Sequence, residues 1–176
     1  MEYIVTQADV NDLQAIYQLF EEAIHFQKVN NDIGWTSYDK AYIQADVQQG
    51  LLFKLLHDGM IVCIFSICYS DPIIWREKEN GDAVYLHRIV LNRAFKQVRV
   101  FKQVLAWAIC HAREMQLTRI RMDTWADNEK IIGYYTSYGF HFIENYTTPA
   151  TPDLPLQHRN LKVALLEFNV PQPGRS

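Results

Sequence analysis

Three basic residues lie close together where a strand pattern gives way to a helix pattern. Arg93, Lys96 and Arg99 belong to LNRAFKQVRVFKQVLAWA, which runs from Leu91 to Ala108. The first turn of a helix leaves several backbone N–H groups unpaired, and the helix dipole adds positive potential there. Because cations at such a position are unfavourable without an anion, the segment predicts a phosphate site. The alternative is that these three charges are solvated on the surface.

The predicted phosphate segment contains no glycine. Glycine allows a backbone to approach a ligand closely and to adopt unusual dihedral angles. The groups that bind phosphate, however, are backbone N–H groups and charged donors, and hydrogen bonds from charged donors are about twice as strong as neutral ones. The lack of glycine therefore does not exclude binding.

Proton transfer could be carried out by a tyrosine or a histidine. Tyr135 lies between two other tyrosines in EKIIGYYTSY, and a phenol with a pKa of about 10 is a proton donor at neutral pH. His87 lies in the apolar strand AVYLHRIVL, and its unperturbed pKa suits proton transfer at neutral pH. Both side chains could instead be structural, and an ordered water could serve as the base. His25 and His141 are further candidates for the base.

The first half of the chain must supply the elements that surround these groups. A short strand over residues 3–5 precedes two helices, over residues 13–24 and 37–49, with apolar residues at helical spacing. Ser37 is predicted to cap the second helix and Gly50 to end it. Two apolar runs then flank Asp-Gly at positions 58–59, a pattern typical of a β-hairpin.

The second half alternates strands and helices. SDPIIWREKENGD is predicted to be a loop, and AVYLHRIVL, RIRMDTW and FHFIENY to be strands. Helices are predicted after the basic segment and from Asn128 to Gly139. The order is β-α-α-β-β-β-α-β-α-β, and LKVALLEFNV forms a last strand after a Pro-rich loop. This pattern predicts an α/β fold, a mixed α+β arrangement with a central mixed sheet and helices on both faces.

Length and composition narrow the possible classes of protein. The 176 residues carry a net charge of −3 at a pI of about 6.0, which gives no indication of nucleic-acid binding. The apolar runs are too short to span a bilayer. We expect one domain over residues 1–170, followed by a short tail over residues 171–176.

The cysteines bear on location and on metal binding. Cys63, Cys68 and Cys110 are odd in number and lie in apolar surroundings, which predicts reduced core thiols and a cytoplasmic location. No His/Cys cluster has the spacing of metal ligands, so we predict no metal site.

Two segments resemble the GNAT superfamily of N-acetyltransferases. They are HRIVLN, before the basic loop, and WADNEKIIGYYTSYGF, and the resemblance covers roughly residues 3–168. The family transfers an acyl group from acyl-coenzyme A to an amine. Its motif of an Asn followed by a helix with a Tyr and a final Gly-Phe matches Asn128, Tyr135 and Gly139-Phe140.

The family's pyrophosphate motif, R/Q-x-x-G-x-G/A, is degraded in this chain. Lys96 stands at the Arg/Gln position, Arg99 at the first glycine and Phe101 at the second. The resemblance nevertheless implies an acetyl-CoA site, with these candidate residues: Ile89, Val90, Leu91, Lys96, Gln97, Val98, Arg99, Val100, Phe101 and Asn128. Phe101 could instead belong to the buried stripe of its helix, and Asn128 could act only as a cap.

The resemblance also implies catalytic roles. Tyr135 matches the acid that protonates the departing thiolate, and a backbone N–H of Val90 or Leu91 matches the oxyanion donor. His87 is the candidate base, since Tyr85 stands where some members carry a Glu. The acceptor pocket is expected between the first two helices, NNDIGW and the loop around Trp75.

We therefore predict an N-acetyltransferase that moves the acetyl group of acetyl-CoA directly to a primary amine of a small acceptor. The alternative is a non-catalytic module of the same fold that binds a ligand or a partner, because both motif glycines are missing. The expected partner is a small-molecule amine, a homodimer is left open, and neither nucleic acid nor a membrane is expected.

Overall fold

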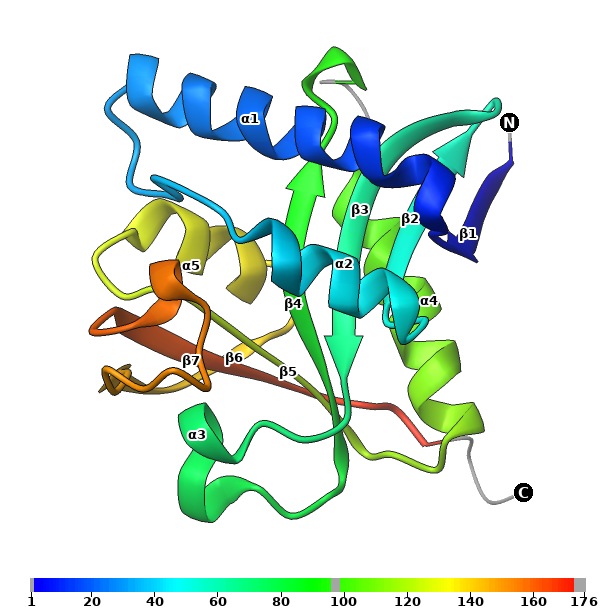
Figure 1. Cartoon of the computed structure of the whole chain (residues 1–176). Helices are drawn as coiled ribbons and strands as arrows, with labels where there is room; N and C mark the ends of the chain where they lie inside the picture. The colour runs from blue at the N-terminus through cyan, green and yellow to red at the C-terminus, as the bar shows by residue number, and fades with distance from the viewer. Residues whose placement is uncertain (1, 96–98, 173–176) are drawn as a thin grey trace.

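The computed structural model of the chain describes residues 2–95 and 99–172. A seven-stranded sheet with the order β1-β2-β3-β4-β5-β7-β6 runs through the molecule, and Figure 1 shows it as a twisted layer. Its strands are β1 (Tyr3–Gln7), β2 (Leu52–His57), β3 (Met60–Cys68), β4 (Ala83–Leu91), β5 (Arg119–Trp125), β6 (His141–Thr147) and β7 (Lys162–Asn169). The β4–β5 pair is parallel and the other pairs are antiparallel, so the sheet is mixed as predicted.

Helices cover both faces of this sheet, which confirms the predicted layers (Figure 1). On one face, α1 (Leu13–Val29) and α2 (Lys40–Gln48) bury apolar side chains against β2, β3 and β4. On the other face, α4 (Val100–Glu114) and α5 (Glu129–Thr136) form the larger core. In α1 and α4, the two longest of these helices, the buried side chains form one stripe because apolar residues recur at three- and four-residue steps.

The structure corrects two local predictions. A short helix, α3 (Pro72–Trp75), forms within the segment predicted to be a loop, because Asp71 accepts a hydrogen bond from Ile74 N–H and proline suits a first helical turn. The cap of α2 is Asp39 rather than Ser37: its carboxylate accepts from the N–H of Ala41 at 2.9 Å. A carboxylate also complements the helix dipole there.

Two predicted glycine positions are confirmed by backbone angles that favour glycine. Gly59 has a φ of 78° in the β2–β3 hairpin, and Gly50 has a φ of 68° just after α2. Gly139 follows α5 with a φ of 96°, and a Cβ at this position would lie 3.2 Å from Phe168 Cε2. The Gly-Phe segment is therefore held by a dihedral requirement and by close packing.

Gly139→Ala is expected to lower the free energy of unfolding by about 1–2 kcal/mol, because an L side chain at positive φ is strained. Urea unfolding followed by circular dichroism measures the change. The matched control is Gly133→Ala within α5, where a Cβ meets nothing within 4 Å. Alanine in a helix interior should raise stability by about 0.5–1 kcal/mol. Equal effects of the two changes would contradict the role given to Gly139.

Among residues 2–95 and 99–172, no helix has both the length and the apolar character needed to cross a membrane.

Candidate active site

The β4 and β5 strands pair over only part of their lengths. Their parallel register joins Ala83 with Arg119 and continues to Tyr85 with Arg121, after which the pairing stops. Beyond this point β5 continues to pair with β7 on its other side. The sheet therefore opens between β4 and β5, and a pocket lies in the opening.

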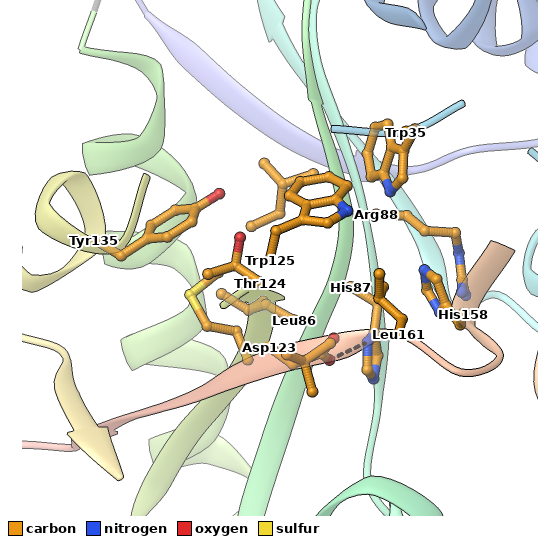
Figure 2. A pocket seen from close by; sticks show the side chains of 13 residues that line it. Trp35, Leu86, His87, Arg88, Asp123, Thr124, Trp125, Tyr135, His158 and Leu161 are labelled. Carbon is orange, nitrogen blue, oxygen red and sulfur yellow. Dashed lines mark ion pairs between the residues drawn. The ribbon is translucent and has the colours of Figure 1, made fainter. Parts of the chain in front are cut away.

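The pocket is lined from both faces of the sheet (Figure 2). Alternation along the strands directs Leu86 and Met122 into the core beneath α4 and α5, where Tyr135 also lies. His87 and Asp123, each one residue further along its strand, point to the opposite face. The full lining is Trp35, Leu86, His87, Arg88, Ile89, Met122, Asp123, Thr124, Trp125, Tyr135, His158, Leu161 and Val163.

A bulge in β4 lies beside this pocket. Ile64 pairs with Val90 and Ser66 with His87, so two residues of β4 stand opposite one residue of β3. One of the two is Arg88, whose φ is 50°. A bulge leaves backbone groups unpaired and turns the strand. The irregular backbone thus lies at Arg88 and the residue after it, before the Val90 and Leu91 N–H groups predicted as oxyanion donors.

His87 lies between two carboxylates. Its Nδ1 is 3.7 Å from Asp123 Oδ1, drawn as a dashed line in Figure 2, and its Nε2 is 3.6 Å from Asp71 Oδ2. The three side chains are 10–13% exposed. Tyr85 lies on the same face of β4, with its ring stacked 6.5 Å from that of His87, as alternation predicted.

Burial changes the protonation of this cluster. It raises the pKa of Asp123 to about 7, with a further contribution from the charge of Asp71. It raises the pKa of Asp71 to about 6. Burial lowers the pKa of His87 to about 3, and the charge of Arg88 acts in the same direction. The unperturbed imidazole pKa assumed from the sequence is therefore wrong for His87. Of the three groups, Asp123 has the pKa closest to 7.

Arg88 also borders the pocket, but it already has a partner. Its guanidinium is ion-paired with Asp46 of α2, and both side chains are largely buried. His158, in a single 3-10 turn over Leu156–His158, lines the same side of the pocket. Burial lowers the pKa of His158 to about 4, so its imidazole is neutral at pH 7.

Tyr85 and Arg121 secure the point at which the strands separate. Arg121 is 3% exposed and donates to Glu167 at 2.8 Å and to the Tyr85 hydroxyl at 3.0 Å. The Tyr85 hydroxyl donates in turn to Glu79 at 2.6 Å. This network fixes the closed end of the opening and occupies the polar atoms of Tyr85.

Tyr135 projects from α5 toward the opening (Figure 2). Its ring packs edge-on against Phe101 at a centroid distance of 4.9 Å. Burial raises its pKa, with a smaller contribution from Cys63, so the phenol stays protonated at neutral pH. Within the described part of the chain no side chain or carbonyl accepts a hydrogen bond from its hydroxyl. The proton is therefore available to a ligand.

Asn128 caps α5 as predicted and also holds a wall of the pocket. Its Oδ1 accepts from Ile131 N–H at 3.1 Å, and its Nδ2 donates to the carbonyl of Ile33 at 2.9 Å. The second bond ties the NNDIGW loop to the start of α5. Trp35 of that loop then meets Trp125 of β5 edge-on at 5.7 Å.

The structure brings only some of the predicted coenzyme residues to the pocket. Ile89 lines it, whereas Val90 is buried beneath α1 and α2. Leu91 and Arg99 are exposed at the end of β4 and the start of α4. Val100 and Phe101 are buried in the larger core, as the alternative for Phe101 expected. Lys96, Gln97 and Val98 lie outside the described residues.

Two other predictions from the sequence are corrected. The segment around Trp75 was expected to line the acceptor pocket, but the Trp75 side chain is fully buried, with its ring packed edge-on against Tyr85 at 5.9 Å, and it is Asp71 of this segment that faces His87. Cys110 is exposed on α4, so only Cys63 and Cys68 have the buried or half-buried positions expected of core thiols.

Sequence reasoning missed Asp71, Asp123 and His158. The position of Asp123 could have been predicted, because alternation in RIRMDTW places its carboxylate on the same strand face as Arg121 and Trp125. Asp71 belonged to a segment predicted only to be a polar loop, and His158 to a Pro-rich loop. Neither segment carries a period that predicts where its side chains lie.

Asp71, His87 and Asp123 each offer a possible metal-ligand atom, and these atoms lie within 4.8 Å of one another. The two ring nitrogens of His87 nevertheless face different carboxylates. A metal ion takes only one nitrogen of a histidine, so this arrangement fits a chain of proton-sharing groups better than convergent ligands.

Comparison with known proteins assigns the family. The model described as the acetyltransferase (GNAT) family matches residues 13–140, more than half of the chain. The chain therefore belongs to the GNAT family of acetyltransferases. It is 25% identical over 105 residues to the uncharacterized N-acetyltransferase YesJ of Bacillus subtilis (strain 168). That match covers 57% of this chain and 58% of the relative, little more than half of its length.

Solved structures share the fold. A GNAT-family acetyltransferase from Listeria monocytogenes 4b F2365 superposes with a TM-score of 0.77 at 22% identity, covering 96% of this chain and 95% of that one. The yncA protein of Salmonella typhimurium, solved with its cofactor acetyl-CoA, gives a TM-score of 0.64 at 14% identity, with coverages of 100% and 98%.

Proposed function

We propose that the protein is an N-acetyltransferase that moves the acetyl group of acetyl-CoA directly to a primary amine of a small acceptor. Family membership supports the reaction class, and the yncA structure with acetyl-CoA supports the donor. The observation that carries the proposal is the opening between β4 and β5, which has Tyr135 on one face and His87 with Asp123 on the other.

The donor would bind along the start of α4. Its pyrophosphate would meet the unpaired N–H groups of the first helical turn and the exposed side chain of Arg99. Its thioester would lie in the opening, with the sulfur near the Tyr135 hydroxyl. Acetyl-CoA would supply the acyl group, and the chain's own groups would position it and move protons.

In direct transfer the neutral amine attacks the thioester carbonyl and forms a C–N bond. The tetrahedral intermediate then breaks its C–S bond, and the thiolate takes the phenolic proton of Tyr135. The proton lost by the new amide nitrogen restores the phenol. No side chain is acylated, so both substrates must be bound together. Cytoplasmic location, suggested by the three free cysteines, belongs to the same proposal.

Calorimetric titration with acetyl-CoA in modest salt tests donor binding, and thiol release with a panel of primary amines tests transfer. We expect micromolar binding and amine-dependent thiol release. No heat up to millimolar coenzyme would contradict the proposal and favour the non-catalytic binding module.

Arg99→Ala is expected to weaken acetyl-CoA binding by roughly tenfold at low salt, because a charge-assisted contact to phosphate is lost. The loss should shrink as salt is raised, since exposed charges are screened. Calorimetry at two salt concentrations measures both effects. Arg113→Ala is the control, because it removes one exposed charge at the opposite end of α4. An identical response of the two variants would make Arg99 an ordinary surface residue.

A further inference from the structure

The acceptor side of the opening carries more negative than positive charge. Asp71 and Asp123 have side chains 11% and 10% exposed, and each faces His87. Arg88 lies close enough to affect both, yet it is already paired with Asp46. Buried carboxylates without a full countercharge are costly. A cation arriving from outside would relieve that cost.

We propose that Asp123 binds the ammonium group of a cationic acceptor amine and removes its proton, while His87, which faces Asp71 on its other side, positions Asp123. This inference rests on the proposed acetyl transfer and names the substrate class of the same site. Asp123 is the catalytic residue in this scheme, and His87 and Asp71 are positioning residues.

The geometry of His87 supports a chain of three groups. A neutral imidazole carries one N–H and one lone pair. Asp123 lies at Nδ1 and Asp71 at Nε2, so the neutral ring can turn its N–H toward one carboxylate and its lone pair toward the other. Asp71 is held by the bond from Ile74 N–H to its Oδ1. Its Oδ2, the atom that faces His87, is buried without a hydrogen-bond partner in the described ranges.

Two tryptophans independently favour an ammonium group. Trp125 lies two residues beyond Asp123 and on the same face of β5, and Trp35 meets it edge-on at 5.7 Å. The face of an indole attracts a cation, with Trp the strongest of the aromatic side chains. A carboxylate beside paired indole rings is a combination that selects an alkylammonium ion over a neutral alcohol.

The cluster takes up one proton, that of the bound ammonium group, in each turnover. An ammonium ion bound at Asp123 gives one proton to the Asp123 carboxylate and becomes a nucleophilic amine. After attack, the nitrogen loses a second proton, which reaches the thiolate by way of Tyr135. The first proton leaves to solvent. The products are the acetylated amine, free coenzyme A thiol and one proton.

Several charged groups face the cluster from the elements around it. They include Arg88 of β4, which is paired with Asp46 of α2, and His158, which is close enough to His87 to affect it and is neutral at pH 7. Glu79 faces Asp71. Since the pKa of Asp71 is raised to about 6 and that of Asp123 to about 7, the cluster takes up a proton near neutrality as a unit. The base form is lost as pH falls, so kcat/KM should fall about tenfold per pH unit below about 7.

The binding test uses n-butylamine, which is protonated at pH 7.5, in buffer with EDTA. Ring nitrogens of 15N-histidine-labelled protein report on His87, and His87→Gln assigns its signals. We expect saturable shifts with n-butylammonium and none with n-butanol. Asp123→Asn should weaken the binding at least tenfold. Asp127→Asn, the same change at an exposed residue of the β5–α5 junction, should leave it unchanged.

The kinetic test follows thiol release from acetyl-CoA with n-butylamine as a function of pH. Asp123→Asn should abolish the fall in kcat/KM near pH 7, and Asp71→Asn should shift it. Normal binding and an unchanged pH profile in Asp123→Asn would overturn the inference and leave acetyl transfer standing. Asp123-dependent ammonium binding without thiol release from any amine would support the ammonium site and overturn acetyl transfer.

Discussion

Tyr135→Phe is expected to lower the turnover number by about 10²–10⁴-fold while the Kd of acetyl-CoA stays nearly the same. The phenol is protonated and lines the opening from the side of α5, and burial keeps its pKa above the ordinary value. Phenylalanine keeps the ring and its packing on Phe101 but cannot protonate a thiolate. Single-turnover thiol release measures the chemical step, and calorimetry measures binding.

Tyr134→Phe is the matched control, since it makes the same change at the adjacent residue. Tyr134 is 39% exposed and does not line the pocket. Its replacement should change the turnover number less than about threefold, because it removes no group from the opening. A parallel loss of turnover and coenzyme affinity in Tyr135→Phe would mean that Tyr135 serves structure rather than proton transfer.

Arg121→Met should lower the free energy of unfolding by about 3–5 kcal/mol, because the largely buried carboxylate of Glu167 loses its buried partner and keeps only the more exposed Arg119. Arg121 joins Glu167 of β7 to Tyr85 of β4 at the last paired position before the sheet opens. Its guanidinium also donates to the carbonyl of Lys78 at 2.8 Å. Urea unfolding of the purified variant measures the effect.

Two further variants separate burial from charge. Arg119→Met removes the other guanidinium that contacts Glu167, but Arg119 is 38% exposed, so the loss should be about 0–1 kcal/mol. The double variant Arg121→Met/Glu167→Gln should recover part of the stability, since the carboxylate that lost its buried partner is replaced by a neutral amide and Arg119 still pairs with Asp82. Equal losses of unfolding free energy for Arg119→Met and Arg121→Met would show that burial of the Arg121–Glu167 pair does not increase its contribution to stability.

The elements of this fold could be predicted from the sequence where local chemistry decides them. The Asp58-Gly59 turn needs positive φ angles, and both residues have them, at 49° and 78°. Asn128 caps α5 because its side chain reaches the N–H of Ile131. Strand alternation also placed Tyr85 and His87 on one face. Each of these features depends on neighbours within a few residues.

The candidate site could be predicted only in part, because its chemistry depends on contacts between distant segments. His87 was recognised as a titratable residue, but its low pKa comes from burial and from Arg88, which the sequence does not show. Asp71 reaches it from a polar segment that folds into a helical turn. The opening itself arises where β4–β5 pairing stops, and no residue type marks that point.

The gap between β4 and β5 would give the proposed acetyl transfer two separate approaches to one reaction centre, since its lining comes from both faces of the sheet. A donor that lies along α4 and α5 and an acceptor that enters beside Trp35 would meet in the gap without crossing each other's path. Coenzyme A would then leave on the side where acetyl-CoA entered, and the acetylated amine on the side where the amine entered. If the two substrates enter separately, neither blocks the binding of the other and both can be bound at once. Double-reciprocal plots of initial rate against amine concentration, at several fixed concentrations of acetyl-CoA, should then give intersecting rather than parallel lines.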